Sequence, residues 1–258
     1  MDDYRNLFDL TGRVALVVGG AGGLGKDMAW ALAQHGADIA VAQRNPDRGA
    51  DLKQAVEQLG RKCKLYKADI CVATDVKLLI DKIEADFGRL DILINSAGIN
   101  ILQKAEEYAE ENWDKVVDLN LKGTYFTCRE AARLMIRQRK GKIINLSSVS
   151  GHLGKPEGYA AYCSSKGGVN MLTKCLAAEW AKYNISVNAI SPTFIRTDIS
   201  AAQLKDAEFH NKLVARIPMG RIGIQRDIIG PALLFASGAA DFITGQIILV
   251  DGGITSTQ

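Results

Sequence analysis

The chain has 258 residues and a formal net charge of +3, with acidic and basic residues mixed along it. This length fits one large α/β domain, and the weak charge disfavours nucleic acids and membranes as partners. Five cysteines without a Cys-x-x-Cys spacing and three scattered histidines disfavour disulfides and metal sites, and the missing apolar signal core and membrane span predict a cytoplasmic protein.

Short β-branched runs alternate with longer helical patterns along the chain, which is typical of a parallel sheet with crossover helices. Pro46 is expected to open one helix, and Gly36 and Gly60 to close two others. Several strands are nearly unbroken apolar runs, as expected when helices cover both faces of a sheet. The predicted fold is α/β, a single doubly wound domain over residues 1–258. The predicted strands are Arg13–Val18, Asp38–Ala42, Lys64–Lys67, Ile92–Asn95, Lys142–Leu146, Ser186–Ile190 and Gln246–Val250.

The first predicted strand runs directly into the glycine-rich segment Val-Val-Gly-Gly-Ala-Gly-Gly-Leu-Gly at residues 17–25. Glycines let the backbone turn sharply and approach a pyrophosphate, whose charge the N-terminus of the next helix can stabilise. Directly after an apolar strand, such a segment predicts a dinucleotide-binding loop in preference to a purely structural turn. The segment fits two registers, Gly20-x-Gly22-x-x-Gly25 and Gly19-x-x-x-Gly23-x-Gly25.

The second predicted strand ends in Val-Ala-Gln-Arg-Asn-Pro at residues 41–46, without the carboxylate that usually holds the ribose hydroxyls of NAD. Arg44 instead offers a planar cation that suits a 2′-phosphate, and the neutral Gln43 does not repel one. The segment therefore predicts that NADP(H) is preferred and that NAD(H) is possible. The alternative is that Arg44 only begins a solvated turn.

Tyr162 and Lys166 lie four residues apart in a predicted helix, so they share one face. An ammonium beside a phenol favours the tyrosinate and is expected to lower the tyrosine pKa from about 10. A phenol adjusted in this way can act as a general acid or base. The alternative is an ordinary interfacial aromatic residue beside a surface lysine.

The alternation of strands and helices pauses at about 194–224, where Ala201–Arg216 is predicted to be helical. An insertion beyond the carboxyl ends of the strands lies where open α/β sheets bind ligands. This segment is a candidate lid over the substrate, and the alternative is a peripheral helix pair without a gating role.

With Asn-Ser-Ala-Gly at residues 95–98, these motifs resemble the short-chain dehydrogenase/reductase family over about Thr11–Gly253. The resemblance implies a Rossmann-type fold, a nicotinamide cofactor, a homotetramer and a catalytic tetrad. By position, the tetrad is Asn120, Ser148, Tyr162 and Lys166; Ser148 is chosen over Ser147 because the family's serine usually precedes Val-x-Gly. The expected cofactor contacts are Gly19, Gly23, Leu24, Gly25, Arg44, Asn45, Asp69, Ile70, Asn95, Ala97, Gly98, Tyr162, Lys166, Pro192, Ile195 and Thr197.

The resemblance implies an oxidoreductase that interconverts a secondary alcohol and a ketone, with Tyr162 as proton donor and Ser148 orienting the carbonyl. The candidate pocket segments are Ile99–Leu102, His152–Tyr159 and Phe194–Met219. Their polar members favour a polyol, sugar or sugar acid, as in gluconate 5-dehydrogenase-like members of the family, over a steroid. The alternatives are a 3-oxoacyl-thioester reductase and a non-enzymatic dinucleotide-binding regulator. The polar rim residues are His152, Lys155, Glu157 and Arg196.

Overall fold

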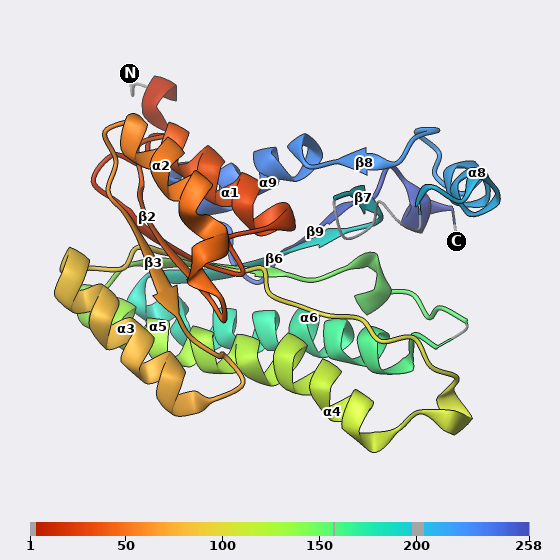
Figure 1. The fold of residues 1–258 in the computed structure, drawn as a ribbon. Helices are drawn as coiled ribbons and strands as arrows, with labels where there is room; N and C mark the ends of the chain where they lie inside the picture. The colour runs from red at the N-terminus through yellow and green to blue at the C-terminus, as the bar shows by residue number, and fades with distance from the viewer. Residues whose placement is uncertain (1–3, 157, 198–203, 258) are drawn as a thin grey trace.

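Figure 1 shows the fold in a computed structural model, which describes residues 4–156, 158–197 and 204–257. Seven parallel strands form one sheet in the order β3-β2-β1-β4-β5-β6-β9. The strand order reverses between β1 and β4, and such a switch point opens a crevice at the carboxyl ends of the strands. The predicted fold class is confirmed, and each predicted strand overlaps an observed one. The strands are β1 Val14–Val18, β2 Asp38–Gln43, β3 Cys63–Lys67, β4 Ile92–Asn95, β5 Gly141–Leu146, β6 Ile185–Pro192 and β9 Ile247–Val250.

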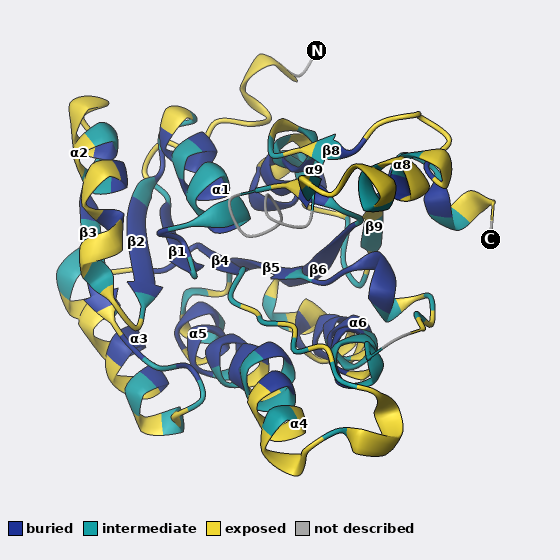
Figure 2. Ribbon diagram, turned by 45° about the vertical axis from the view of Figure 1, so that its right-hand side comes forward, coloured by how far each residue is buried: buried dark blue, intermediate teal, exposed yellow. Residues whose placement is uncertain are grey.

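Helices cover both faces of the sheet (Figures 1 and 2). One face carries α1 (Gly23–Gln34), α2 (Ala50–Gln58) and α9 (Arg226–Ala236). The other carries α3 (Ala73–Phe87), α5 (Thr124–Gln138) and α6 (Ala160–Trp180), with α4 (Glu110–Val117) beside α6. No helix among the described residues is long and apolar enough to cross a membrane.

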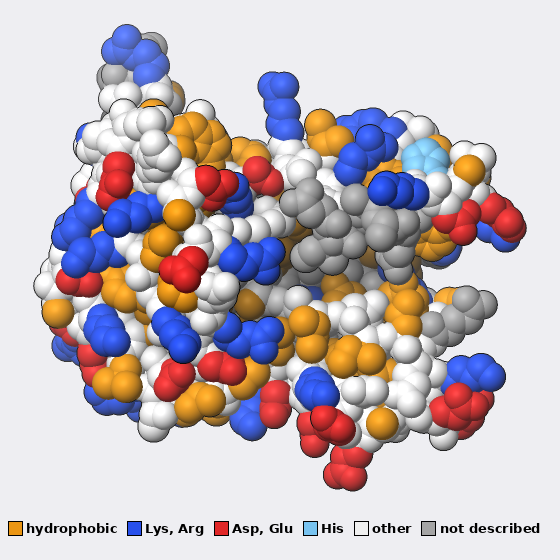
Figure 3. All heavy atoms as spheres, in the orientation of Figure 1, with side chains coloured by type: hydrophobic (Ala, Val, Ile, Leu, Met, Phe, Trp, Pro, Cys, Tyr) orange, Lys and Arg blue, Asp and Glu red, His pale blue; other side chains and the backbone are white. Residues whose placement is uncertain are grey.

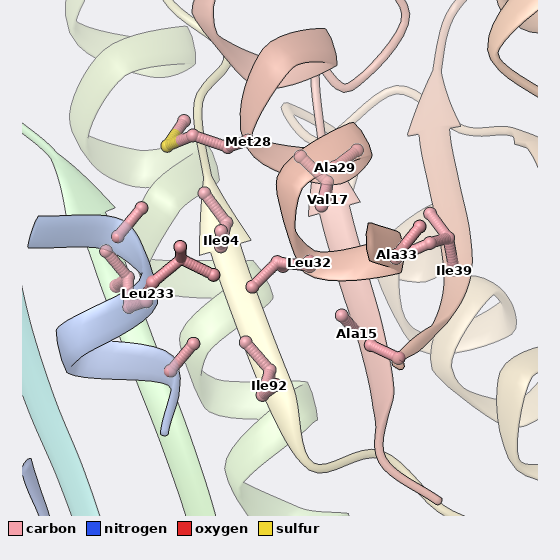
Figure 4. Close-up of a cluster of buried hydrophobic side chains, with 14 of the residues drawn as sticks. Ala15, Val17, Met28, Ala29, Leu32, Ala33, Ile39, Ile92, Ile94 and Leu233 are labelled. Atoms are coloured by element: carbon pink, nitrogen blue, oxygen red, sulfur yellow. The ribbon is translucent and has the colours of Figure 1, made fainter. Parts of the chain in front are cut away.

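Two hydrophobic cores lie on the two faces of the sheet. Figure 4 shows the first, in which Val17 of β1 and Ile94 of β4 pack with Leu32 of α1 and Leu233 of α9. Alternate residues of the same strands, including Leu16, point into the second core beneath α3, α5 and α6. Because side chains are buried on both faces, all five residues of β1 are buried, which explains the unbroken apolar run in the sequence.

The helix ends agree with the sequence signals at three positions. Pro46 opens a short 3-10 helix that leads into α2, and the Asn45 side chain caps it by accepting from the Asp47 amide. Gly36 and Gly60 follow α1 and α2 with φ of +101° and +72°. A Cβ on Gly36 would also lie 2.5 Å from the Thr11 hydroxyl, so both the positive φ and the close contact require glycine there.

The segment 194–224 lies beyond the carboxyl ends of the strands (Figure 1). It contains β7 (Ile195–Arg196), α8 (Ala207–Ala215) and β8 (Gly223–Ile224), and β7 pairs with β8. The predicted start of the helix at Ala201 falls outside the described residues. The described helix begins at Ala207 because the Asp206 carboxylate caps it, accepting from the Glu208 and Phe209 amides at 2.9 and 3.1 Å.

Candidate active site

The structure brings the four predicted tetrad residues together at the carboxyl edge of the sheet. Asn120 lies in a π-helical turn between α4 and α5, Ser148 follows β5, and Tyr162 and Lys166 lie on α6. The Ser148 side chain lies near enough to the Tyr162 hydroxyl to lower its pKa, and the Lys166 ammonium lies 5.8 Å from the centroid of the Tyr162 ring. A Cβ on Gly98 would lie 3.2 Å from Asn120 Oδ1 and 3.6 Å from Lys166 Nζ, so these two groups flank the same glycine.

Hydrogen bonds to the backbone fix the Asn120 side chain, which is fully buried. Its Oδ1 accepts from the Ile99 amide at 2.8 Å, and its Nδ2 donates to the Ile99 carbonyl at 2.9 Å and to the Ser165 hydroxyl at 3.1 Å. These bonds satisfy the buried amide and connect the turn before α5 to the segment that follows β4. The π-helical conformation around Asn120 is a feature often found at functional sites.

The two neighbouring serines have different partners. The Ser147 hydroxyl donates to the backbone carbonyl of Lys166 at 3.2 Å, which connects β5 to α6. The Ser148 Oγ instead accepts from the Ser150 amide at 3.1 Å, and the Ser148 side chain lies near enough to the Tyr162 hydroxyl to lower its pKa. This geometry supports the choice of Ser148 over Ser147 as the residue that contacts a reacting carbonyl.

The expected lowering of the Tyr162 pKa is wrong in this structure. Burial raises the pKa of the phenol, and the nearby Ser148 side chain opposes this only in part. The Lys166 ammonium is hydrogen-bonded to the Leu146 carbonyl at 2.8 Å, and burial lowers its pKa to about 8. Desolvation therefore outweighs the attraction that the four-residue spacing suggests. The phenol is protonated at neutral pH, which is the form that donates a proton.

The structure distinguishes the two glycine registers. Gly19 has a φ of +75°, and a Cβ there would lie 2.9 Å from the Ala97 amide nitrogen. Gly23 begins α1 with a φ of +50°, and a Cβ on Gly25 would lie 2.4 Å from the Gly19 carbonyl oxygen. Gly22 has extended backbone and open space around it. Only the wider register, Gly19-x-x-x-Gly23-x-Gly25, thus requires glycine at every position.

The residues expected at the adenosine end of a cofactor lie after β2 and β3. Arg44 and Asn45 are exposed, while Ile70 is buried against Gly123. Asp69 Oδ1 accepts from the Cys71 amide at 3.0 Å. Burial raises the pKa of the Cys71 thiol to about 11, and the Asp69 carboxylate raises it further, whereas Arg44 lowers it. The charges of Asp69 and Arg44 therefore both lie near Cys71.

The other expected cofactor residues divide into supporting and bordering positions. The buried Asn95 donates to Asn145 Oδ1 at 2.9 Å and accepts from the Thr127 hydroxyl at 2.6 Å, which connects β4 to β5 and α5. Ala97 lies against Gly19, and the half-buried Leu24 packs on the first core. Of the remaining positions, Pro192 ends β6, Ile195 begins β7, and Thr197 follows β7.

A small cleft lies next to Ser148, lined by Val149 and other residues of the loop after Ser148 on one side and by residues of the segment 194–224 on the other. Figure 3 shows the surface indented below α8, where this cleft lies. Lys155 and Phe194 line it as predicted, whereas Ile99–Leu102, His152 and Arg196 do not, and Glu157 lies outside the described residues. Sequence reasoning did not assign Val149, Thr193 and Ile254 to the lining.

Only tertiary packing reveals these three lining residues. Val149 and Ile254 join Leu213, Ile217 and Ile222 in a small third core, separate from the two sheet cores. Ile254 follows Asp-Gly-Gly, a turn whose two glycines have positive φ, and no periodic pattern shows where that turn directs the chain. The segment 194–224 thus packs against the loop that carries Ser148.

Comparison with known proteins identifies the family. A family model described as enoyl-(acyl carrier protein) reductase matches residues 19–255. A crystal structure of a short-chain type dehydrogenase/reductase from Mycobacterium marinum is 35% identical and superposes with a TM-score of 0.92, covering 97% of this chain and 98% of that one. The chain belongs to the short-chain dehydrogenase/reductase family. Membership confirms the prediction of an oxidoreductase of a family that acts on CH–OH groups.

Two further relatives of this dehydrogenase/reductase are similar over nearly their whole length. A 2-dehydro-3-deoxy-D-gluconate 5-dehydrogenase of Pseudoalteromonas atlantica is 40% identical, with 95% of this chain and 97% of that protein covered. A gluconate 5-dehydrogenase of Burkholderia cenocepacia, crystallised with NADP and tartrate, is 37% identical with a TM-score of 0.93, covering 97% and 98% of the two chains. The predicted resemblance to gluconate 5-dehydrogenase-like members is confirmed.

The described part of this dehydrogenase/reductase holds no cluster of three or more His, Cys, Asp or Glu side chains that could bind a metal ion. On the face drawn in Figure 3, Lys and Arg side chains are interspersed with Asp and Glu side chains. This face therefore offers no extended patch of one sign that would attract a polyanion.

Proposed function

We propose that the protein is an NADP(H)-preferring reductase and dehydrogenase that interconverts a secondary alcohol and a ketone on a polyol, sugar or sugar acid. The observation that carries this proposal is the placement of Ser148, Tyr162, Lys166 and Asn120 close together, with Val149, the residue after Ser148, lining a cleft. The glycine loop lies at the switch point on the same edge of the sheet. These features supply a proton donor, a carbonyl ligand and a dinucleotide site.

In ketone reduction, a bound nicotinamide would supply a hydride, and negative charge would then develop on the carbonyl oxygen. The Ser148 hydroxyl donates a hydrogen bond to that oxygen and orients it. The Tyr162 phenol, which burial keeps protonated, transfers its proton to the same oxygen. The Lys166 ammonium stabilises the tyrosinate that results, and Asn120 fixes the backbone at Ile99 beside it. The oxidation of an alcohol uses the same groups in reverse.

The residues present fit a nicotinamide dinucleotide. A Cβ at Gly19 or Gly25 would collide with backbone atoms, which shows how closely the loop is packed, and the N-terminus of α1 follows it. Arg44 is exposed at the end of β2 and carries the charge that a 2′-phosphate needs. The Burkholderia relative was crystallised with NADP, which supports this preference. A higher kcat/KM with NADH than with NADPH would contradict it.

The names of the relatives support a hydroxylated acid or polyol as substrate, because two of them act on derivatives of gluconate. The most direct experiment follows NADPH consumption with ketogluconates, ketoses and acetoacetyl thioesters. We expect turnover with ketogluconates or ketoses. Turnover with thioesters alone would instead support the second candidate, a 3-oxoacyl-thioester reductase, which the acyl-carrier-protein description of the family model favours.

We further propose that the chain forms one dinucleotide-binding domain, with the segment 194–224 as a lid over the substrate. Two observations support this: all seven main strands belong to one sheet, and the third core joins this segment to the loop after Ser148. A homotetramer is proposed from exposed apolar side chains such as Tyr125 on α5 and Met171 on α6. A monomer in analytical ultracentrifugation would contradict it. Five free cysteines favour a reducing, cytoplasmic location.

A further inference from the structure

The charged residues among the described lining of the cleft next to Ser148 all have the same sign. Among the described residues that line it, Lys155 and Arg216 are cations and none is an acid. The rest of the described lining is apolar or uncharged and includes Phe194, Leu213 and Ile254. A concave, partly apolar site lined by charge of one sign attracts and concentrates ligands of the opposite sign.

Lys155 is held in a defined place instead of extending into solvent. The side chain is half-buried, and its ammonium lies 4.9 Å from the centroid of the Phe194 ring and 5.1 Å from that of the Tyr159 ring. Burial lowers the pKa of Lys155; the nearby Cys163 thiol opposes this in part, and the positive charge of Arg216 adds to it. The ion pairs of the described residues include no carboxylate partner for this ammonium.

Burying the Lys155 ammonium costs free energy when no anion is bound beside it. Moving an ammonium out of water is unfavourable, and two aromatic faces offset only part of that cost. A carboxylate bound beside Lys155 would offset more of it, because a charge-assisted hydrogen bond strengthens in a poorly hydrated site. The same carboxylate would also relieve the repulsion between the two cations of the cleft.

Lys155 also lies at the right place relative to the tetrad. Its ammonium lies over the Tyr159 ring, and that ring packs edge to face on the Tyr162 ring with centroids 6.5 Å apart. Val149, the residue after Ser148, lines the same cleft. A short chain-like substrate can therefore have one end at the Ser148 and Tyr162 hydroxyls and its other end at Lys155.

We propose that Lys155 binds the terminal carboxylate of a hydroxylated keto acid whose ketone lies at Tyr162, and that this contact selects sugar acids over neutral polyols. The proposal rests on the proposed function, because it narrows the substrate class of the same site. Arg216, on the opposite side of the cleft, adds positive potential. Lys155 is then a specificity-determining residue that takes no part in the proton transfer.

Two matched substrates test the proposal. 5-Keto-D-gluconate and L-sorbose have the same carbon chain, ketone and hydroxyl configuration, and they differ only in a terminal carboxylate in place of a primary alcohol. Steady-state kinetics with NADPH should be measured for both substrates with the wild type, Lys155→Met and Lys155→Arg. Lys182→Met is the control, since Lys182 also lies over a tyrosine ring, at 5.2 Å from Tyr183, but on an exposed turn after α6.

We expect Lys155→Met to lower kcat/KM for 5-ketogluconate by roughly 10- to 100-fold, mostly through KM, because it removes one charged hydrogen bond. The kcat/KM for L-sorbose should change less than about threefold, because no carboxylate is lost there. Lys155→Arg should retain most of the activity on 5-ketogluconate, and Lys182→Met should leave both substrates unchanged. Tartrate should inhibit the wild type more strongly than it inhibits Lys155→Met, whereas the neutral threitol should not distinguish them.

The possible failures are distinguishable. Equal losses on both substrates in Lys155→Met, or none on either, would overturn the role of Lys155 while leaving the proposed function in place. A loss confined to acetoacetyl-CoA would assign Lys155 to a different anion and would also overturn it. A wild type that reduces neither 5-ketogluconate nor any ketose, but does reduce thioesters, would instead contradict the proposed function.

Discussion

The two sides of the cleft are built in different ways. We call the tetrad of Asn120, Ser148, Tyr162 and Lys166 the inner wall; it adjoins the cleft lining through Val149, and three of its polar side chains are almost fully buried. Their partners are mostly backbone groups, such as the carbonyl of Leu146 and both backbone groups of Ile99. The outer wall, defined as Phe194, Leu213, Arg216 and Ile254, consists of side chains around a small core of its own.

This difference separates chemistry from specificity. Side chains bonded to the backbone of central strands and long helices keep a fixed geometry, which proton transfer requires. The outer wall depends on the packing of a few apolar residues from distant segments, so its side chains can be exchanged without disturbing the sheet. Changes in the inner wall should therefore lower kcat, and changes facing the outer wall should mainly alter KM.

The largest expected effect is in the inner wall. Tyr162→Phe removes the only hydroxyl that the mechanism uses as a proton donor and keeps the ring that packs on Tyr159. We expect kcat to fall by about 10²–10⁴, the usual contribution of a general acid. NADPH affinity, measured by fluorescence titration, should change little. Retained turnover would show that the proton comes from elsewhere.

The glycine loop offers a second, smaller test with an internal control. In Gly19→Ala the new Cβ would meet the Ala97 amide nitrogen, and the residue would be strained at a φ of +75°. We expect the free energy of unfolding of Gly19→Ala to be about 1–3 kcal/mol lower than that of the wild type, and its NADPH affinity to be lower as well. Gly22→Ala, which has open space and an extended backbone, should behave like the wild type. Urea unfolding and NADPH titration of both variants measure this; equal effects would refute the wider register.

Local patterns predicted Tyr162 and Lys166 of the inner wall, and the family resemblance predicted Asn120 and Ser148. The apolar run of β1, the wider glycine spacing and the four-residue spacing of Tyr162 and Lys166 are all encoded by adjacent residues. The direction of the Tyr162 pKa was not predictable, because it depends on burial beneath segments that are distant in sequence. The outer wall was only partly predictable, since Ile254 reaches it through a turn without any periodic signal.

The altered pKa of Lys166 predicts a pH-dependent stability. Burial lowers that pKa from 10.5 to about 8, so below pH 8 the lysine is charged in both states and burial of the charge destabilises the fold fully. Between pH 8 and 10.5 the unfolded chain binds more protons, so the native state gains stability as pH rises. The unfolding free energy of the wild type minus that of Lys166→Met should therefore increase by up to about 1.4 kcal/mol per pH unit in this window.

Urea unfolding at pH 7.5, 8.5 and 9.5 measures this difference. Burial raises the pKa of Cys63 to about 11 and that of Cys128 to about 12, which makes the stability of both proteins fall as the pH rises. Because both proteins share this effect, it cancels in their difference. Lys182→Met, which removes an exposed charge, should show a difference from the wild type that does not vary with pH. A constant difference for Lys166→Met as well would mean that its ammonium is better solvated than its burial implies.

The smallest expected effect concerns the support behind Ser148. Asn170 lies one turn after Lys166 on α6, is buried, and donates through Nδ2 to the Gly151 carbonyl at 3.1 Å. Because Gly151 closes the short helix that Ser148 caps, this bond holds Ser148 against the helix that carries Tyr162. Asn170→Ala should lower kcat by roughly 2- to 10-fold, the value of one hydrogen bond, with an unchanged KM for NADPH. Ser186 lies at the end of β6 far from the tetrad, and its buried hydroxyl has no hydrogen-bond partner among the described residues. Ser186→Ala should therefore leave kcat unchanged. If both variants lost activity equally, the effect of Asn170 would be one of general stability, and the inner wall would depend on packing as the outer wall does.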